Sequence, residues 1–244
     1  MADSPWLVAR SPRPGAGLRV VCLPFAGGNA GAFDAWGPLF PEHVEVCAVR
    51  YPGRRERVHE PSIRRMSLLV AALRAGLEGH LDRPYVLFGH SLGAKVAFEL
   101  ARRVSPAPRR LVVSSSPAPH HAERLPDLPA MTDHEVVTEL VARGTMPAEV
   151  ARHPELVEVA VPAIRADYEL ARTYRFRDNG PVGVPIDAVA GEDDSFVTPE
   201  ALRAWGELTT GAFTSTFVPG GHDLLSRPGH VVDAVLAACE REPA

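Results

Sequence analysis

The feature that most constrains the fold is the alternation of short apolar runs with helical patterns along the 244 residues. The apolar runs predict strands, and most are too continuously apolar for burial on one face only; they cover 19–24, 44–51, 85–89, 110–115, 185–190 and 213–218. Helical patterns lie between them, at about 62–80, 92–104, 198–208 and 230–241. This alternation requires crossover connections, so it predicts a mainly parallel sheet with helices on both faces, in a single α/β domain over 1–244.

One long interval breaks the alternation. Between Ser115 and Pro185 the chain carries two helical patterns and no strand candidate over about seventy residues, which is uncommon for a connection in a compact domain. We therefore expect an inserted helical lid over about 117–183. The second pattern has one apolar stripe at helical spacing, formed by Val157, Val161, Ile164 and Tyr168. A stripe of this kind packs on a core, lines a substrate site, or does both.

Charge and cysteine content narrow the class of protein. The formal net charge of −4 gives no basic field, which argues against nucleic acid as the main partner. Cys22, Cys47 and Cys239 are odd in number, far apart and placed in apolar segments, so we expect free thiols and a reducing, cytoplasmic location. The first residues lack a secretion signal pattern and no window approaches about 18 uninterrupted apolar residues, so we expect no membrane partner.

A serine stands between a predicted strand and a predicted helix. Residues 89–93 read GHSLG, which matches G-x-S-x-G, with strand-like YVLF before it and helical LGAKVAFELA overlapping its end. In a nucleophile elbow both glycines are needed, because side chains there would collide with neighbouring backbone. The helix N-terminus also directs free N–H groups to the place where negative charge develops. The context therefore predicts that Ser91 is a nucleophile rather than a capping serine in a glycine-rich turn.

A serine nucleophile needs a histidine as base and an acid to orient that histidine. Among the 10 histidines, His222 directly follows the last predicted strand, in VPGGHDLL, where a loop at the carboxyl edge of the sheet can reach Ser91. His90 must point away from the serine, and we assign it a structural role. In AVAGEDDSFV the expected acid is Asp194, with Asp193 as the alternative. The order serine, aspartate, histidine along the chain is that of the α/β-hydrolases.

Two backbone donors are needed for an oxyanion hole. One is the N–H of Leu92, the residue after the nucleophile, and the other should come from a loop after an early strand. LPFAGGNAGAF at 23–33 is such a loop, and its glycine pair lets the backbone approach a substrate closely. We expect Ala26 to be the second donor, with Phe25 as the fallback. Neither glycine-rich phosphate-binding pattern is present, and we predict no cofactor and no metal site.

Taken together, these segments resemble the stand-alone type II thioesterases of polyketide synthase and nonribosomal peptide synthetase systems. The resemblance covers about 18–240 and rests on LPFAGG, RYPGRRER, FGHSLGAKVAFELA, PELVEVAVPAIRADYELARTYRF, AGEDDSFV and PGGHDLL. It implies an α/β-hydrolase fold with an inserted helical lid. It also implies hydrolysis of acyl thioesters from the phosphopantetheine arm of acyl or peptidyl carrier proteins, which edits stalled or mis-primed synthase modules.

The resemblance also implies roles for individual residues. The family's triad falls on Ser91, Asp194 and His222, and its oxyanion positions fall on Ala26 and Leu92. Phe25 stands where the family often has histidine, and Leu92 where it often has methionine, which bears on substrate preference. The family implies no cofactor of the enzyme's own, because the substrate arrives on the phosphopantetheine of a partner protein.

Three other functions use the same features. A carboxylesterase would carry the same triad, although the HGGG oxyanion motif of many esterases is absent. An acyltransferase would pass the acyl group to an amine or an alcohol. A carrier-binding module without catalysis would not need the intact set of candidate residues. Matched ester and thioester substrates, product analysis and labelling with a fluorophosphonate distinguish these functions.

Arginines gather after the second predicted strand. They are Arg50, Arg54, Arg55, Arg57, Arg64 and Arg65, with only Glu56 and Glu60 nearby to offset them. Because carrier proteins are typically acidic, such a patch could steer a carrier to the enzyme. The alternative is a solvated face with mixed charges.

Overall fold

A seven-stranded sheet organises the structure, a computed structural model that describes residues 4–121, 125–146 and 149–241. The strand order is β1-β3-β2-β4-β5-β6-β7, with β1 antiparallel to β3 and the remaining neighbours parallel. The strands are β1 (Leu7–Val8), β2 (Leu18–Leu23), β3 (Val44–Val49), β4 (Tyr85–His90), β5 (Arg110–Ser114), β6 (Ile186–Gly191) and β7 (Phe213–Val218). The parallel sheet predicted from the apolar runs is confirmed.

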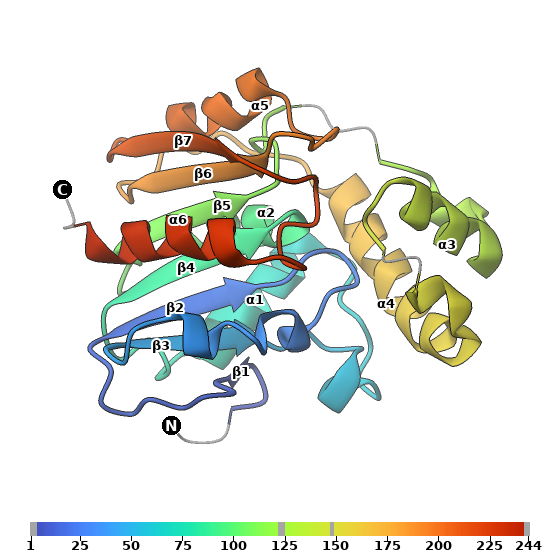
Figure 1. The fold of residues 1–244 in the computed structure, drawn as a ribbon, viewed down its shortest axis with the longest axis horizontal. Coiled ribbons are helices and arrows are strands. Elements are labelled where there is room, and N and C mark those ends of the chain that lie inside the picture. Colours follow the sequence, from blue (N-terminus) through green and yellow to red (C-terminus); the bar gives the residue numbers. More distant parts are fainter. Residues whose placement is uncertain (1–3, 122–124, 147–148, 242–244) are drawn as a thin grey trace.

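Helices cover both faces of this sheet (Figure 1). On one face α1 (Met66–Leu77) and α2 (Leu92–Ala101) pack through fully buried side chains such as Leu73 and Phe98. On the other face α6 (Gly229–Glu240) buries Val231 and Val235. The shorter helices are η1 (Ala30–Phe33), η2 (Gly37–Leu39), η3 (Arg55–Arg57), α5 (Pro199–Arg203) and η6 (Ala204–Leu208). Burial of the sheet on both sides explains why most of its strands are continuously apolar, whereas the edge strand β7 is only partly buried.

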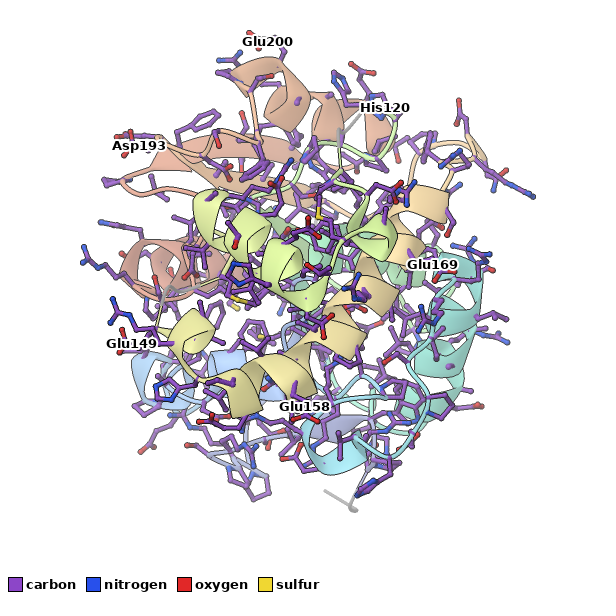
Figure 2. The ribbon with its side chains drawn as sticks, turned by 90° about the vertical axis from the view of Figure 1, so that its right-hand side faces the viewer. His120, Glu149, Glu158, Glu169, Asp193 and Glu200 are labelled. Atoms are coloured by element: carbon purple, nitrogen blue, oxygen red, sulfur yellow. The ribbon has the colours of Figure 1, made fainter. Side chains whose placement is uncertain are left out.

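Further helices fill the long interval between β5 and β6. They are η4 (Leu128–Ala130), α3 (Asp133–Ala142), η5 (Val150–Arg152) and α4 (Pro154–Thr173). These helices lie beyond the arrowheads of the parallel strands in Figure 1, and Figure 2 looks onto them. They have an apolar cluster of their own, in which Val161, Ile164 and Tyr168 of the predicted stripe are buried and Val157 packs against them. The insertion therefore stands over the carboxyl edge of the sheet.

Apart from shifts of two or three residues at element ends, the observed elements differ from the predicted ones at three places. β1 has only two residues, too few to show a periodic pattern, and no sequence argument indicated it. α1 begins at Met66 rather than near 62. Ser62 lies instead against Gly53, so closely that a Cβ added to Gly53 would be 2.0 Å from the serine Oγ. The single helix predicted over 198–208 is divided into α5 and a 3₁₀ segment.

The three cysteines are free and buried, as their apolar surroundings predicted. Burial raises the pKa of each thiol, to about 12 for Cys47 and for Cys239. Within the described parts of the chain, none of the helices combines the length and the apolar character that crossing a membrane requires.

Candidate active site

Ser91 occupies the sharp turn between β4 and α2. Its backbone has φ 54° and ψ −118°, a conformation that is strained for any residue other than glycine. A Cβ at Gly89 would lie 2.2 Å from the carbonyl oxygen of Gly93, and a Cβ at Gly93 would lie 2.3 Å from that of Leu23. These atoms belong to the backbone of the helix and of β2, so they cannot move aside cheaply. The close approaches explain both glycines of the GHSLG motif.

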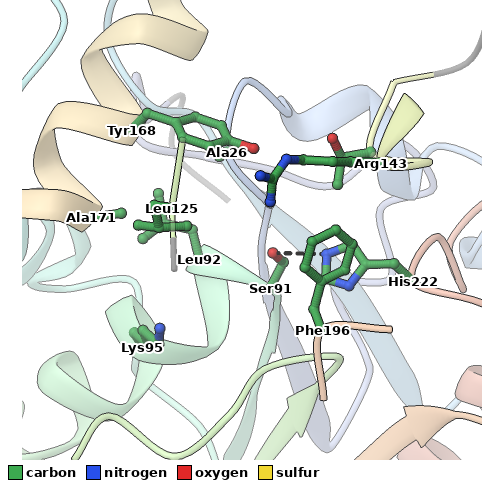
Figure 3. Close-up of a pocket in the computed structure, with 11 residues that line it drawn as sticks. Ala26, Ser91, Leu92, Lys95, Leu125, Arg143, Tyr168, Ala171, Phe196 and His222 are labelled. Atoms are coloured by element: carbon green, nitrogen blue, oxygen red, sulfur yellow. Dashed lines mark hydrogen bonds between the residues drawn. The ribbon is translucent and has the colours of Figure 1, made fainter. Parts of the chain in front are cut away.

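Ser91, His222 and Asp194 form one hydrogen-bonded chain. His222 Nε2 lies 3.1 Å from Ser91 Oγ (Figure 3), and His222 Nδ1 lies 3.2 and 3.0 Å from Oδ1 and Oδ2 of Asp194. A proton on Nδ1 is donated to the carboxylate, which leaves Nε2 free to accept the serine proton. Asp194 Oδ1 also accepts the N–H of Phe196 at 2.9 Å, whereas Asp193 is exposed and lies at the periphery of Figure 2.

The loops that carry the acid and the histidine pack against each other. They follow β6 and β7, which are parallel neighbours, so both loops leave the sheet at the same edge. A Cβ at Gly191 would lie 2.2 Å from the carbonyl oxygen of Gly220 and 2.4 Å from that of Gly221. This close backbone approach brings the Asp194 loop next to the His222 loop. The Phe196 ring then packs on His222, with 4.9 Å between the ring centroids.

His90 supports the site from within the core. It is buried, its Nδ1 lies 3.0 Å from Ser114 Oγ, and its ring centroid lies 5.5 Å from that of His222. Burial, and next the nearby His222, lower the pKa of His90 well below its usual range. A neutral His90 packs beneath His222 without adding a second positive charge. The structural role predicted for His90 agrees with these contacts.

The two residues expected to supply the oxyanion donors, Ala26 and Leu92, line the same cavity as Ser91. Leu92 is the first residue of α2, so its N–H has no partner within the helix. Ala26 is the second residue of the turn 25–28, which is closed by a hydrogen bond of 2.9 Å between its end residues. Gly27, the third residue of this turn, has φ 75°, a value that favours glycine.

Two cavities meet at Ser91, and Ala26, Tyr168 and His222 border both of them. The smaller, of about 40 Å³, lies between α2 and the insertion, and its lining includes Leu92, Leu125, Ala171 and Phe196. The larger, of about 410 Å³, lies between the loop after β2 and the insertion, and its lining includes Gly27, Gly28, Arg55, Met146 and Ile164. A substrate with one short and one long limb on either side of a reactive carbonyl fits this arrangement.

Two cations line the smaller cavity, and the sequence reasoning did not find them. Lys95 follows Ser91 by about one helical turn on α2 and is only 8% exposed. Arg143 ends α3, pairs with Glu139 through Nε, and lies 5.8 Å from the centre of the Phe196 ring. Its terminal nitrogens point toward the space around Ser91 (Figure 3). The sequence could have indicated Lys95 as a lining residue, because it follows the predicted nucleophile by one helical turn. It holds no corresponding signal for Arg143.

The predicted arginine patch is wrong in two of its members. Arg54 is 7% exposed and pairs with a buried aspartate of α4. Arg57 is 9% exposed, pairs with Glu60 at 2.6 Å, and lies 3.9 Å from the centre of the Trp6 ring. These guanidinium groups hold the fold together and are not available to a partner. The exposed pair of arginines at 64 and 65 faces a glutamate of α4, at 2.8 and 3.7 Å.

Known proteins share this architecture and these sequence features. A protein-family model, described as the thioesterase domain, matches residues 18–242. The chain belongs to the thioesterase family. This thioesterase is 32% identical over 224 residues to the gramicidin S biosynthesis protein GrsT of Aneurinibacillus migulanus, which covers 90% of this chain and 88% of GrsT. It is also 39% identical over 223 residues to the AMB antimetabolite synthetase AmbE of Pseudomonas aeruginosa, of which it spans only 10%.

Solved structures, among them that of a type II thioesterase, match this thioesterase closely. BorB, the type II thioesterase from the borrelidin biosynthetic cluster, gives a TM-score of 0.89 at 36% identity and covers 99% of this chain and 100% of BorB. ClbQ from the colibactin NRPS/PKS pathway gives 0.86 at 28% identity, over 92% of this chain and 98% of ClbQ. The α/β-hydrolase fold and the resemblance to type II thioesterases predicted from sequence are therefore confirmed.

Proposed function

We propose that this thioesterase hydrolyses acyl groups from the phosphopantetheine arm of acyl or peptidyl carrier proteins, and so clears stalled or mis-primed modules of a synthase. The observation that carries the proposal is the position of Ser91, linked through His222 to Asp194, where two cavities of unequal size meet. The names of GrsT, BorB and ClbQ place those relatives in gramicidin S biosynthesis, the borrelidin biosynthetic cluster and the colibactin NRPS/PKS pathway.

The first half of the reaction forms an acyl-enzyme. Ser91 Oγ attacks the thioester carbonyl while His222 Nε2 takes its proton, and Asp194 holds the imidazole in the required tautomer. The N–H groups of Ala26 and Leu92 stabilise the oxyanion of the tetrahedral intermediate. The intermediate collapses by breaking the C–S bond. Since a thiol has a pKa of about 8.5, the sulfur leaves with little help from the proton on His222. The departing thiolate then takes this proton, which returns His222 to its neutral form.

The second half releases the acyl group as a carboxylic acid. A water molecule gives a proton to His222 Nε2 and attacks the ester carbonyl, and the same two N–H groups hold the second oxyanion. The ester C–O bond breaks, and His222 returns its proton to Ser91 Oγ. The enzyme is then ready for another carrier.

The two cavities suggest how the substrate lies. The smaller, mostly apolar cavity suits a short acyl group, and the larger one suits the long amide-containing pantetheine limb. Arg55 is an exposed cation that lines the larger cavity, where it could pair with the phosphate of the arm. In this arrangement α3 and α4 act as the lid that encloses the reacting carbonyl.

The decisive experiment compares the wild type with Ser91→Ala on an acyl carrier protein loaded with a short acyl group. We expect the variant to fold normally and to lose at least about 1000-fold in kcat, because the nucleophile is absent. Activity above a few per cent of wild type would contradict the assignment. A matched ester and thioester of one acyl group, with amine and alcohol acceptors added separately, test the esterase and acyltransferase alternatives.

A further inference from the structure

Three segments that carried the family resemblance meet in a buried cluster behind the turn 25–28, which we call the oxyanion loop. They are the glycine pair of PFAGG, Arg54 of YPGR and Asp167 of RADY. Arg54 donates from both terminal nitrogens to the Asp167 carboxylate, at 2.8 and 2.9 Å. The two side chains are 7% and 2% exposed. None of these groups belongs to the triad, so the cluster does not take part in the proton transfers between Ser91, His222 and Asp194.

The buried pair holds the oxyanion loop at two backbone atoms. Gly27 N–H donates to Asp167 Oδ2 at 2.7 Å, and Arg54 donates to the carbonyl oxygen of Gly28 at 2.8 Å. A Cβ at Gly27 would also lie 2.3 Å from Ile164, so this part of the loop rests directly on α4. The loop therefore takes its shape from a helix more than a hundred residues further along the chain.

The hydrogen bond from Gly27 fixes the orientation of the Ala26–Gly27 peptide, which directly follows the proposed donor, the Ala26 N–H. The turn 25–28 has Gly27 at its third position with φ 75°, and the Ala26–Gly27 peptide is its central peptide. In four-residue turns the central peptide can rotate between two orientations. The rotation changes ψ of the second residue, here Ala26, and φ of the third residue, here Gly27. A charged acceptor for the Gly27 N–H selects one orientation, because a buried N–H without a partner is costly.

We propose that Asp167, held in place by Arg54, is a positioning residue that sets the Ala26 N–H for oxyanion stabilisation. This inference deepens the proposed function and rests on it, since Ala26 is there the oxyanion donor. Asp167 lies on α4, so the oxyanion hole is complete only while this helix of the insertion is docked on the loop. Because α4 both covers the acyl group and holds the oxyanion loop, binding of the acyl group is coupled to the correct geometry of the oxyanion hole.

The first test is Asp167→Asn, with Glu169→Gln as the matched control on the same helix. Glu169 pairs with Arg64 at 2.8 Å on the surface, far less buried than Asp167, and lies at the outside of Figure 2. For a small acyl thioester we expect Asp167→Asn to lower kcat by about 10- to 100-fold and to leave KM within about threefold. The control should keep both constants near wild type.

A transition-state analogue distinguishes positioning from general stabilisation of the fold. A trifluoromethyl ketone forms a tetrahedral adduct with Ser91 whose oxygen occupies the oxyanion hole. In Asp167→Asn its inhibition constant should rise by the same factor by which kcat/KM falls. An unchanged inhibition constant in the folded variant, or an equal effect in Glu169→Gln, overturns the proposal.

The double variant Arg54→Met, Asp167→Leu keeps the test valid if the single variant does not fold. It removes both charges together, so no unpaired charge remains buried, and we expect it to fold with a Tm above that of Asp167→Asn, lowered from wild type only by the lost backbone hydrogen bonds of Gly27 and Gly28. Its kcat should stay low, because the loop has lost both of its holding groups; recovery of kcat together with Tm overturns the proposal. If the wild type itself hydrolyses no thioester, the proposed function fails, while ketone binding still reports on Asp167.

Discussion

Gly93→Ala is the substitution whose effect can be worked out most directly from the structure. A Cβ at this position would lie 2.3 Å from the carbonyl oxygen of Leu23 and 2.6 Å from that of Pro24, whereas ordinary contacts begin at 3.4 Å. The start of α2 must therefore separate from the end of β2 by about 1 Å, because a packed interior leaves little free space. Leu92 directly precedes Gly93, and the turn 25–28 directly follows Pro24, so this shift widens the proposed oxyanion hole.

The expected cost of this shift is large for catalysis and moderate for stability. A misplacement of about 1 Å costs about 100-fold in rate, and overpacking lowers the free energy of unfolding by about 1–3 kcal/mol. Catalysis is measured as kcat/KM on an acetyl thioester of N-acetylcysteamine, by the free thiol released, and stability is measured by urea unfolding.

The control for Gly93→Ala is Gly17→Ala. An added Cβ at Gly17 would meet no atom within 4 Å, so we expect both properties to stay near wild type. A Gly93→Ala enzyme with kcat/KM within about threefold of wild type and unchanged stability would refute the steric reasoning. It would show that α2 and β2 tolerate the added methyl group without moving the donors.

Three further predictions concern single side chains of the site. Asp194→Asn should lower kcat by about 10⁴-fold and Asp193→Asn by less than about twofold; the reverse order would exchange their roles. Because the pKa of His90 is lowered in the folded protein, stability should fall as the pH drops below the unfolded pKa of about 6.5. Between about pH 7.5 and about pH 5.5 the free energy of unfolding should fall further for the wild type than for His90→Gln in urea unfolding, and equal losses would contradict this. Arg143→Met should lower the preference for a malonyl over a propionyl thioester by about tenfold, since a charged hydrogen bond contributes roughly 1.5–3 kcal/mol; an unchanged preference would remove Arg143 from acyl selection.

The residues of the candidate triad could be found from sequence because each directly follows a recognisable strand. Ser91, Asp194 and His222 come after β4, β6 and β7, and parallel strands place their carboxyl ends at one edge of the sheet. The glycines of the elbow mark the backbone approach at Ser91. The local sequence patterns and the expectation of a parallel sheet were therefore sufficient to predict that these three side chains lie together.

The environment of the charged groups could not be found in this way. Arg54 and Arg57 look like surface cations in the sequence, yet Asp167 and Trp6, which bury them, lie far away along the chain. A count of neighbouring charges does not reveal such partners. Arg143 could not be predicted for the same reason, because its position beside Ser91 depends on how the insertion docks on the domain.

The burial of the three thiols has a consequence for an enzyme that works among activated acyl groups. Thioesters exchange with thiolates, and a thiol with its pKa raised to about 12, as at Cys47 and Cys239, has almost no thiolate at neutral pH. Cys22 is buried as well, and its pKa is also raised. The three cysteines therefore offer a thioester no competing sulfur nucleophile, so the protein avoids self-acylation and mixed disulfides with the thiol that thioester hydrolysis sets free.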